Sequence, residues 1–89
     1  MPEVWIPSLM RKLTHGRDKV IVEGSTLREV IENLEVQFPG IKDRVVFEDY
    51  RIAHGLAVAI DGVVTEDGLR ARVSPESEIH FVTSIAGGG

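Results

Sequence analysis

A single amphipathic helix is the feature that most restricts how this 89-residue chain can fold. Apolar residues recur at the three-and-four spacing of one helical face, at Leu27, Val30, Ile31, Leu34 and Phe38. Thr26 and Glu29 form the pattern of a capping box at the start of this helix, and Pro39-Gly40 marks its end. Because one apolar stripe can seal one face of a small sheet, the sequence predicts a single main helix packed on strands.

Strand character precedes the helix. Residues 3–9 are predicted to form an opening strand, with Val4 and Ile6 on one face and Trp5 on the other. Pro7 has no amide hydrogen, so the strand is expected to end near it or to stay unpaired on that side. Residues 19–23 are predicted to form a second strand, which makes an antiparallel hairpin with the first.

Strand character also returns after the helix. A short helical turn against the core and a loop precede it: the turn is expected from Ile41, Val45, Val46 and Phe47, and the loop from residues 48–51 and 54–55. Residues 56–60 form the next predicted strand, and Asp61-Gly62 before Val63-Val64 is typical of a two-residue hairpin turn. Residues 78–83 form the last predicted strand, with His80 and Val82 on the face opposite Ile79 and Phe81.

This order of elements predicts an α+β protein. The first and last strands can run parallel in the middle of a mixed sheet of four or five strands, and the helix then crosses one face in the right-handed sense. The arrangement is the β-grasp, or ubiquitin-like, fold. We assign residues 1–84 to this domain and residues 85–89 to a flexible C-terminal glycine tail.

The composition excludes several classes of function. Without cysteine the chain forms no disulfide, thiolate nucleophile or iron–sulfur cluster. The net charge is −4 and the Lys and Arg residues are scattered along the sequence, so no nucleic-acid partner is expected. No apolar run approaches the length of a membrane span, no basic amphipathic helix suits a membrane surface, and the start has no leader pattern. The expected location is cytoplasmic, without a membrane partner.

The side chains offer little chemistry of their own. His15, His54 and His80 are isolated in the sequence, so no metal site is predicted. The serines do not lie in a nucleophile-elbow pattern. No glycine-rich loop opens a helix, so stable nucleotide binding by this chain is not expected.

The last five residues suggest a different kind of site. Ile85-Ala86 precedes Gly87-Gly88-Gly89, and residues without Cβ atoms can enter a channel too narrow for other side chains. Five residues reach at most about 17 Å, and the group that they deliver is the terminal carboxylate. Taken alone, such a tail is weak evidence of function, because a frayed end or a leftover linker is the favoured interpretation of an arbitrary chain that ends in glycines.

Several short motifs follow one another in the order and spacing of a known family. They are Ile6-Pro7 with Leu9, Arg11, Leu13 and Thr14; residues 22–34 with Gly24, Thr26 and Leu27; Pro39-Gly40-Ile41; Gly68-Leu69; and Ile85-Ala86-Gly87-Gly88. In these motifs the chain resembles the ubiquitin-like sulfur carrier proteins, the group that contains the small subunit of molybdopterin synthase and the thiamine-pathway sulfur carrier. The resemblance extends over almost the whole chain.

This resemblance implies a carrier protein and not an enzyme. A partner related to ubiquitin-activating enzymes would thread Ile85, Ala86, Gly87 and Gly88 into its ATP site and adenylate the carboxylate of Gly89. A persulfide on a sulfurtransferase or cysteine desulfurase would then replace AMP and leave a thiocarboxylate, which gives its sulfur to an acceptor synthase. The third glycine departs from the family's closing Gly-Gly, so either a peptidase trims Gly89 and Gly88 becomes the reacting residue, or the tail works one residue longer.

Trp5, His80 and Val82 are candidates for docking the adenylating partner, because the helix is expected to cover the opposite face of the central strands. The alternative is that the loop around Tyr50 or the 63–64 hairpin covers Trp5.

Two other functions remain open at this point. One is a ubiquitin-like modifier that is conjugated to lysines through the same tail. The other is a non-catalytic β-grasp interaction domain whose tail has no role. The sequence does not identify the acceptor of the sulfur, and molybdopterin, thiazole, an amino acid, tRNA and a specialised metabolite all remain possible.

Overall fold

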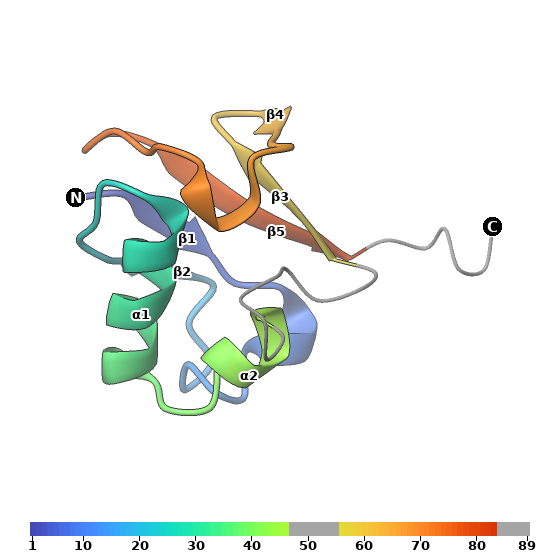
Figure 1. Cartoon of the computed structure of the whole chain (residues 1–89). Coiled ribbons are helices and arrows are strands. Elements are labelled where there is room, and N and C mark those ends of the chain that lie inside the picture. The colour runs from blue at the N-terminus through green and yellow to red at the C-terminus, as the bar shows by residue number, and fades with distance from the viewer. Residues whose placement is uncertain (47–55, 84–89) are drawn as a thin grey trace, which may run out of the picture.

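The computed structural model describes residues 1–46 and 56–83. The described elements are β1 (Glu3–Trp5), the 3₁₀ helix η1 (Ser8–Met10), β2 (Lys19–Ile21), α1 (Leu27–Gln37), α2 (Lys42–Val45), β3 (Leu56–Ile60), β4 (Val63–Val64), the 3₁₀ helix η2 (Gly68–Arg70) and β5 (Glu78–Thr83). Helix α1 lies on one face of a twisted sheet that the strands form (Figure 1).

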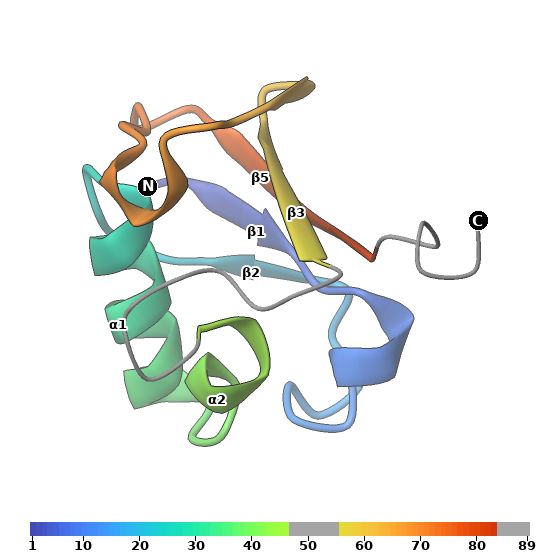
Figure 2. The same ribbon diagram turned by 45° about the vertical axis from the view of Figure 1, so that its right-hand side comes forward.

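The sheet has five strands in the order β2-β1-β5-β3-β4. The central strands β1 and β5 are parallel, and the other neighbours are antiparallel. Turning the molecule shows α1 crossing the face of β1 and β2, with α2 beyond its C-terminal end (Figure 2). The predicted α+β class, the mixed sheet and the β-grasp fold are confirmed.

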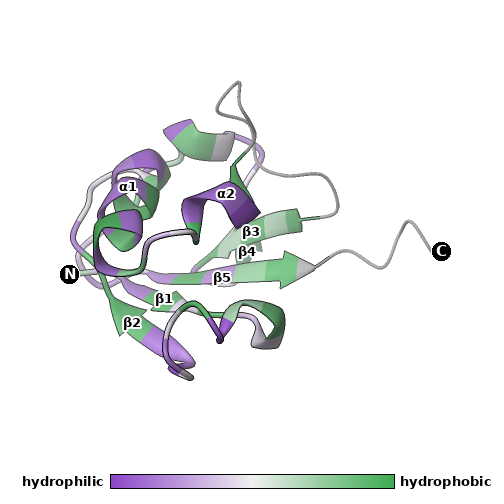
Figure 3. Cartoon of the chain, turned by 90° about the horizontal axis from the view of Figure 1, so that it is seen from below, coloured by the Kyte–Doolittle hydropathy of each residue, from purple (hydrophilic) through white to green (hydrophobic). Residues whose placement is uncertain are grey.

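The predicted apolar stripe of α1 forms the centre of the core. Leu27, Val30 and Leu34 are fully buried, and Ile31 and Phe38 are nearly so. They pack in one cluster with buried side chains of the central strands, Val4, Val58, Ile79 and Phe81. In this arrangement the strands are largely hydrophobic, whereas hydrophilic residues cover the outer sides of α1 and α2 (Figure 3).

The N-terminus of α1 is capped as predicted in one respect and differently in another. The Thr26 hydroxyl accepts a hydrogen bond from the Glu29 amide at 3.2 Å, as in a capping box. The Glu29 carboxylate, however, does not return to Thr26: it accepts from both the amide and the hydroxyl of Ser25, each at 2.9 Å. The hydrogen bond from the Ser25 amide, more than that from its hydroxyl, lowers the pKa of Glu29.

Both N-terminal strands are shorter than predicted. Strand β1 ends at Trp5 rather than Leu9, because the chain turns at Pro7 into η1, where the Met10 amide donates to the Pro7 carbonyl at 2.9 Å. Strand β2 ends at Ile21, and Gly24 then crosses the first turn of α1. A Cβ at Gly24 would lie 2.7 Å from the Val30 side chain, so only glycine fits this crossing.

The predicted β3–β4 hairpin is confirmed. Asp61 and Gly62 form its turn with positive φ angles of 53° and 86°. The Asp61 carboxylate also accepts hydrogen bonds from the Ser77 hydroxyl at 3.0 Å and from the Glu78 amide at 2.9 Å. The turn is therefore fastened to the beginning of β5, which offsets the cost of a left-handed aspartate.

The predicted helical turn after α1 corresponds to α2, and Ile41, Val45 and Val46 are buried there. The predictions for Phe47, for residues 48–51 and for residues 54–55 lie outside the described residues.

Candidate functional site

The candidate site begins where β5 ends. Because β1 and β5 are parallel, their C-terminal ends meet at the same edge of the sheet. Strand β5 pairs with β1 from Glu78 to His80 and with β3 up to its last residue, Thr83. The predicted tail residues Ile85, Ala86, Gly87, Gly88 and Gly89 lie outside the described residues. The described part of the site therefore consists of the end of the sheet at Thr83, after which the tail sequence follows, and of the adjoining sheet face.

The face of the sheet opposite α1 carries the three predicted docking residues. Ile79 and Phe81 of β5 are buried toward the helix, while His80 is half-buried on the other face and Val82 is 47% exposed there. Trp5 is opposite His80 in the parallel register. Their rings stack with centroids 5.1 Å apart and planes 13° apart. The structure thus brings Trp5 and His80 together as one aromatic platform.

Lys19 extends this platform, and the sequence analysis missed it. It is opposite Trp5 in the antiparallel β1–β2 register, and its Nζ lies 5.2 Å from the centroid of the Trp5 ring. This distance is typical of a cation–π contact. The signal in the sequence was the hairpin itself, since pairing residues 3–5 with 19–21 places a lysine next to the tryptophan.

The Trp5 indole has one unmet requirement. Its Nε1 is inaccessible to solvent, and it has no hydrogen-bond partner among residues 1–46 and 56–83. Tryptophan nitrogens that are removed from water usually donate to an acceptor. The platform therefore contains a donor that a small rearrangement on binding could satisfy.

The alternative that the 63–64 hairpin covers Trp5 does not fit the sheet. Ala59 of β3 is opposite both His80 and Val64, so β4 is three strands from β1. At about 4.8 Å per strand that separation is about 14 Å. The other alternative, a covering loop around Tyr50, lies outside the described residues.

A shallow hollow of 560 Å³ adjoins the platform on the same face. It is lined by Ala59, Asp61, Gly62, Glu78, His80 and Val82. His80 Nε2 lies 3.5 Å from a carboxylate oxygen of Glu78, a long and weak contact. This open, mixed surface suits contact with another protein and provides no nucleophile next to a base.

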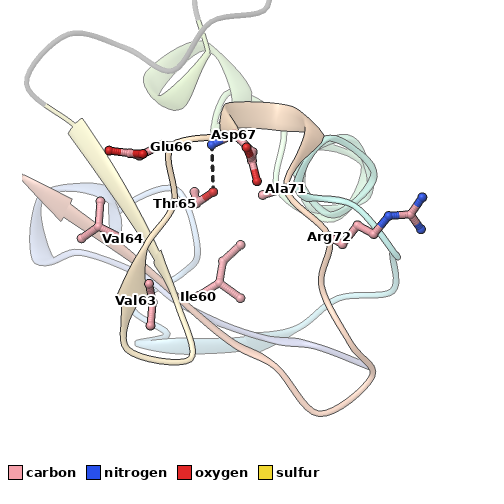
Figure 4. Close-up of a pocket in the computed structure, with 8 residues that line it drawn as sticks. All are labelled: Ile60, Val63, Val64, Thr65, Glu66, Asp67, Ala71 and Arg72. Atoms are coloured by element: carbon pink, nitrogen blue, oxygen red, sulfur yellow. Dashed lines mark hydrogen bonds between the residues drawn. The ribbon is translucent and has the colours of Figure 1, made fainter.

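A second hollow, of 380 Å³, lies between the β3–β4 hairpin and the segment around η2 (Figure 4). Ile60 lies at its centre, and the Asp67 amide donates to the Thr65 hydroxyl at 3.1 Å on its rim. Arg72 points away from the hollow.

The described part of the chain contains neither a cluster of metal-ligating side chains nor a helix that could cross a membrane. Within residues 1–46 and 56–83, no three histidine, aspartate or glutamate side chains are placed to hold a metal ion. His15 packs near Phe38, with ring centroids 6.0 Å apart, and His54 lies outside these ranges. No helix in the same ranges is long and apolar enough to span a bilayer.

Comparisons with known proteins agree with this geometry. Residues 4–88 match the ThiS family, while no curated protein matches the chain. A chain in the crystal structure of the Amycolatopsis orientalis BexX/CysO complex is 28% identical, with a TM-score of 0.90, and the alignment covers 98% of this chain and 99% of that one.

Two less similar structures share the fold. The crystal structure of Mycobacterium tuberculosis CysO, an antigen, has 22% identity and a TM-score of 0.89, with coverage of 94% and 99%. The solution structure of the small archaeal modifier protein 1 (SAMP1) from Methanosarcina acetivorans has 16% identity and a TM-score of 0.80, with coverage of 97% and 94%. The family match covers residues 4–88 of the 89, so the chain belongs to the ThiS family of ubiquitin-like sulfur carrier proteins.

Proposed function

We propose that this protein is a sulfur carrier whose C-terminal glycine carboxylate is activated by a partner enzyme and converted to a thiocarboxylate. The observation that carries the proposal is the position of the glycine tail in a ThiS-family β-grasp domain. The tail continues from β5, a central strand that pairs with β1 up to His80 and with β3 up to Thr83. A partner that binds the sheet therefore meets a tail whose first residue follows directly from an ordered strand.

The chemistry requires little from the domain itself. A carboxylate oxygen of Gly89 attacks the α-phosphorus of ATP in the partner's site, which releases pyrophosphate and forms an acyl adenylate. The terminal sulfur of a persulfide on a sulfurtransferase or cysteine desulfurase then attacks the acyl carbon and releases AMP. A thiol reduces the resulting acyl disulfide and frees the thiocarboxylate, which transfers its sulfur to a biosynthetic acceptor. The domain's own task is to be recognised and to present the tail.

The third glycine adds one possible step. If a peptidase removes Gly89, the carboxylate of Gly88 becomes the reacting group. If the peptide bond between Gly88 and Gly89 stays intact, the tail is one residue longer than the closing Gly-Gly of the family. Variants with chain ends at Gly88 and at Gly89 distinguish these routes.

Intact mass spectrometry tests the proposal. Purified protein is incubated with ATP, a ubiquitin-activating-type adenylating enzyme from the same organism, and a sulfide or persulfide source. The expected product is heavier by the difference between sulfur and oxygen on the last glycine. The control lacks Gly88 and Gly89 and should remain unchanged. Absence of both adenylate and thiocarboxylate on the full-length protein, with an enzyme that activates another carrier, would overturn the proposal.

Conjugation to other proteins is the second candidate function, supported by the structural likeness to SAMP1, which is called a modifier. It uses the same activated carboxylate, but a lysine amine attacks the acyl carbon and an isopeptide bond forms. The same incubation with cell extract would then yield adducts of higher mass that carry the tail. If removal of Gly88 and Gly89 has no biological effect, neither function holds and the protein is an interaction domain.

A further inference from the structure

The connection between β1 and β2 concentrates positive charge in an acidic protein. Arg11, Lys12, Arg17 and Lys19 lie within residues 8–19, where Asp18 is the one acidic residue. This segment, here named the basic loop, therefore has a net charge of +3, whereas the whole chain has a net charge of −4. Four of the ten Lys and Arg residues of the chain thus lie in one short segment.

The basic loop lies at the edge of the sheet where β5 ends. It follows the C-terminal end of β1, and the parallel register places that end beside His80, in the middle of β5. Figures 1 and 2 show η1 and the end of β5 on the same side of the molecule. The loop is closed by a hydrogen bond from the Ile6 amide to the Asp18 carbonyl at 2.8 Å. The loop thus begins on the side of the molecule toward which β5 and the tail sequence run.

The shape of the loop is fixed from within. Thr14 is fully buried, and its hydroxyl donates to the Arg17 carbonyl at 2.8 Å. Arg11 Nε donates to the Ile6 carbonyl at 3.2 Å. The loop therefore presents its cations on a defined scaffold.

The cations of the loop are not neutralised by the described part of the protein. All four side chains are exposed, and none forms an ion pair with a carboxylate of residues 1–46 or 56–83. By contrast, Lys42 Nζ lies 2.7 Å from a Glu32 oxygen. Leu9, in the same segment, is 78% exposed. The segment therefore combines exposed cations that have no carboxylate partner in the described chain with an exposed leucine.

The opposite end of the sheet is acidic. Glu3 and Glu78 are neighbours in the β1–β5 register, at the N-terminal ends of both strands. Asp61 is bonded to the Glu78 amide there, and the exposed Glu76 is close in sequence. Along the central strands the charge thus changes from negative to positive toward the tail edge.

We propose that the basic loop, through Lys12 and Arg17 above all, docks on an acidic surface of the adenylating enzyme beside the entrance to its tail channel. This inference rests on the proposed function and adds a second contact to the Trp5 platform, which Lys19 joins directly to the loop. When the end of the sheet that carries the tail faces the partner, the basic loop is near the partner and the acidic end of the sheet is far from it. Charge complementarity of this kind acts mainly on the association rate.

A protein surface fits the charges better than a nucleic acid does. A nucleic-acid strand longer than the loop would also meet the acidic end of the same small domain, and its phosphates would be repelled there. A compact acidic patch on a protein meets the loop alone. Binding of the loop to an oligonucleotide is therefore the contrary outcome of the test.

The test compares two charge reversals of equal size. Lys12→Glu/Arg17→Glu changes the loop, and Arg70→Glu/Arg72→Glu changes exposed arginines in and after η2 by the same net charge. Association with the adenylating enzyme is measured by stopped-flow fluorescence at 0.1 M and 1 M salt. The loop variant is expected to associate roughly tenfold more slowly at 0.1 M salt. The difference should shrink at 1 M, where the Debye length falls from about 10 Å to about 3 Å.

The outcomes separate this inference from the proposed function. Equal slowing of both variants would attribute the effect to net charge alone and overturn the inference, as would no slowing of the loop variant. In either case the proposed function stands if the wild-type protein still supports tail-dependent ATP–pyrophosphate exchange, and if that exchange is absent, both fail. Salt-sensitive binding of the wild-type protein to a fluorescent single-stranded oligonucleotide, lost in the loop variant, would also overturn the protein-docking assignment.

Discussion

Trp5 shows how much one residue can contribute to the open face. Its ring contacts His80 on one neighbouring strand and Lys19 on the other, so two strands each place a side chain against the indole. Large aromatic side chains that are partly exposed and held in place often dominate the energy of an interface. Its solvent-inaccessible Nε1, without a partner in the described chain, adds a polar group that a bound protein can satisfy.

Replacement of this ring should weaken docking without unfolding the domain. For Trp5→Ala we expect at least a tenfold higher Kd for the adenylating enzyme, about 1.4 kcal/mol, measured by isothermal titration calorimetry. Val36→Ala is the matched control, since Val36 is 79% exposed on α1. Circular dichroism checks that the fold persists. A Kd equal to that of the wild-type protein would remove Trp5 from the docking surface.

Part of this residue-scale arrangement could be predicted from the sequence. Alternation along residues 3–6 and 78–83 placed Trp5, His80 and Val82 opposite the helix, because a strand changes face at every residue. The ring stacking and the Lys19 contact were not predicted. Both depend on the register between strands that are distant in sequence, which alternation within one strand does not determine.

At the scale of the elements, the link between α1 and α2 depends on one carboxylate. Glu35 accepts hydrogen bonds from the Gly40 amide at 3.0 Å and from the Lys42 amide at 2.8 Å. The Gly40 bond first, and then the Lys42 bond, lowers the pKa of Glu35 below its ordinary value of 4.5. The charged carboxylate thus holds the chain reversal between the two helices.

This contact predicts a loss of stability in acid. A lowered pKa in the folded state contributes stability above pH 4.5, and the contribution is lost as the pH falls through the lowered folded-state pKa. Glu35→Gln should therefore unfold at a lower urea concentration at pH 7 and lose less additional stability on acidification. Urea titrations across this range provide the measurement. Glu66→Gln, at an exposed position, serves as the control, and an identical pH profile for wild type and Glu35→Gln would contradict the assignment.

The elements themselves were predictable to different degrees. Helix α1, the β3–β4 hairpin and β5 follow from local patterns, and their predicted positions are confirmed. The first strand was predicted too long, because β-branched and aromatic residues favour a strand even where Pro7 starts a turn. The Glu35 contacts were missed, since they form only after the chain reverses at Gly40.

At the scale of the whole molecule, the last strand is structurally central. Strand β5 pairs with β1 and β3, and its side chains Ile79 and Phe81 belong to the core. The sequence predicted this topology because a single crossing helix and right-handed connections leave few ways to arrange the strands. The last described residues of the chain are therefore required for folding.

Two truncations separate folding from function. A chain that ends at Ser84 should keep the melting temperature of the full protein to within a few degrees, because about 0.5 kcal/mol or less is expected from terminal residues outside the core. It should not form an adenylate. A chain that ends at Ser77 lacks β5 and should be unfolded by circular dichroism. A large drop in melting temperature for the Ser84 variant would show that the tail is part of the folded domain.

The parallel pairing of β1 and β5 also has a mechanical consequence. Tension applied between the two ends of the chain would pull these neighbouring strands past each other, so their hydrogen bonds would resist in shear and together rather than opening one by one. A protein with this topology is expected to resist unfolding when its tail is pulled, either in the narrow channel of an enzyme or by a degradation machine.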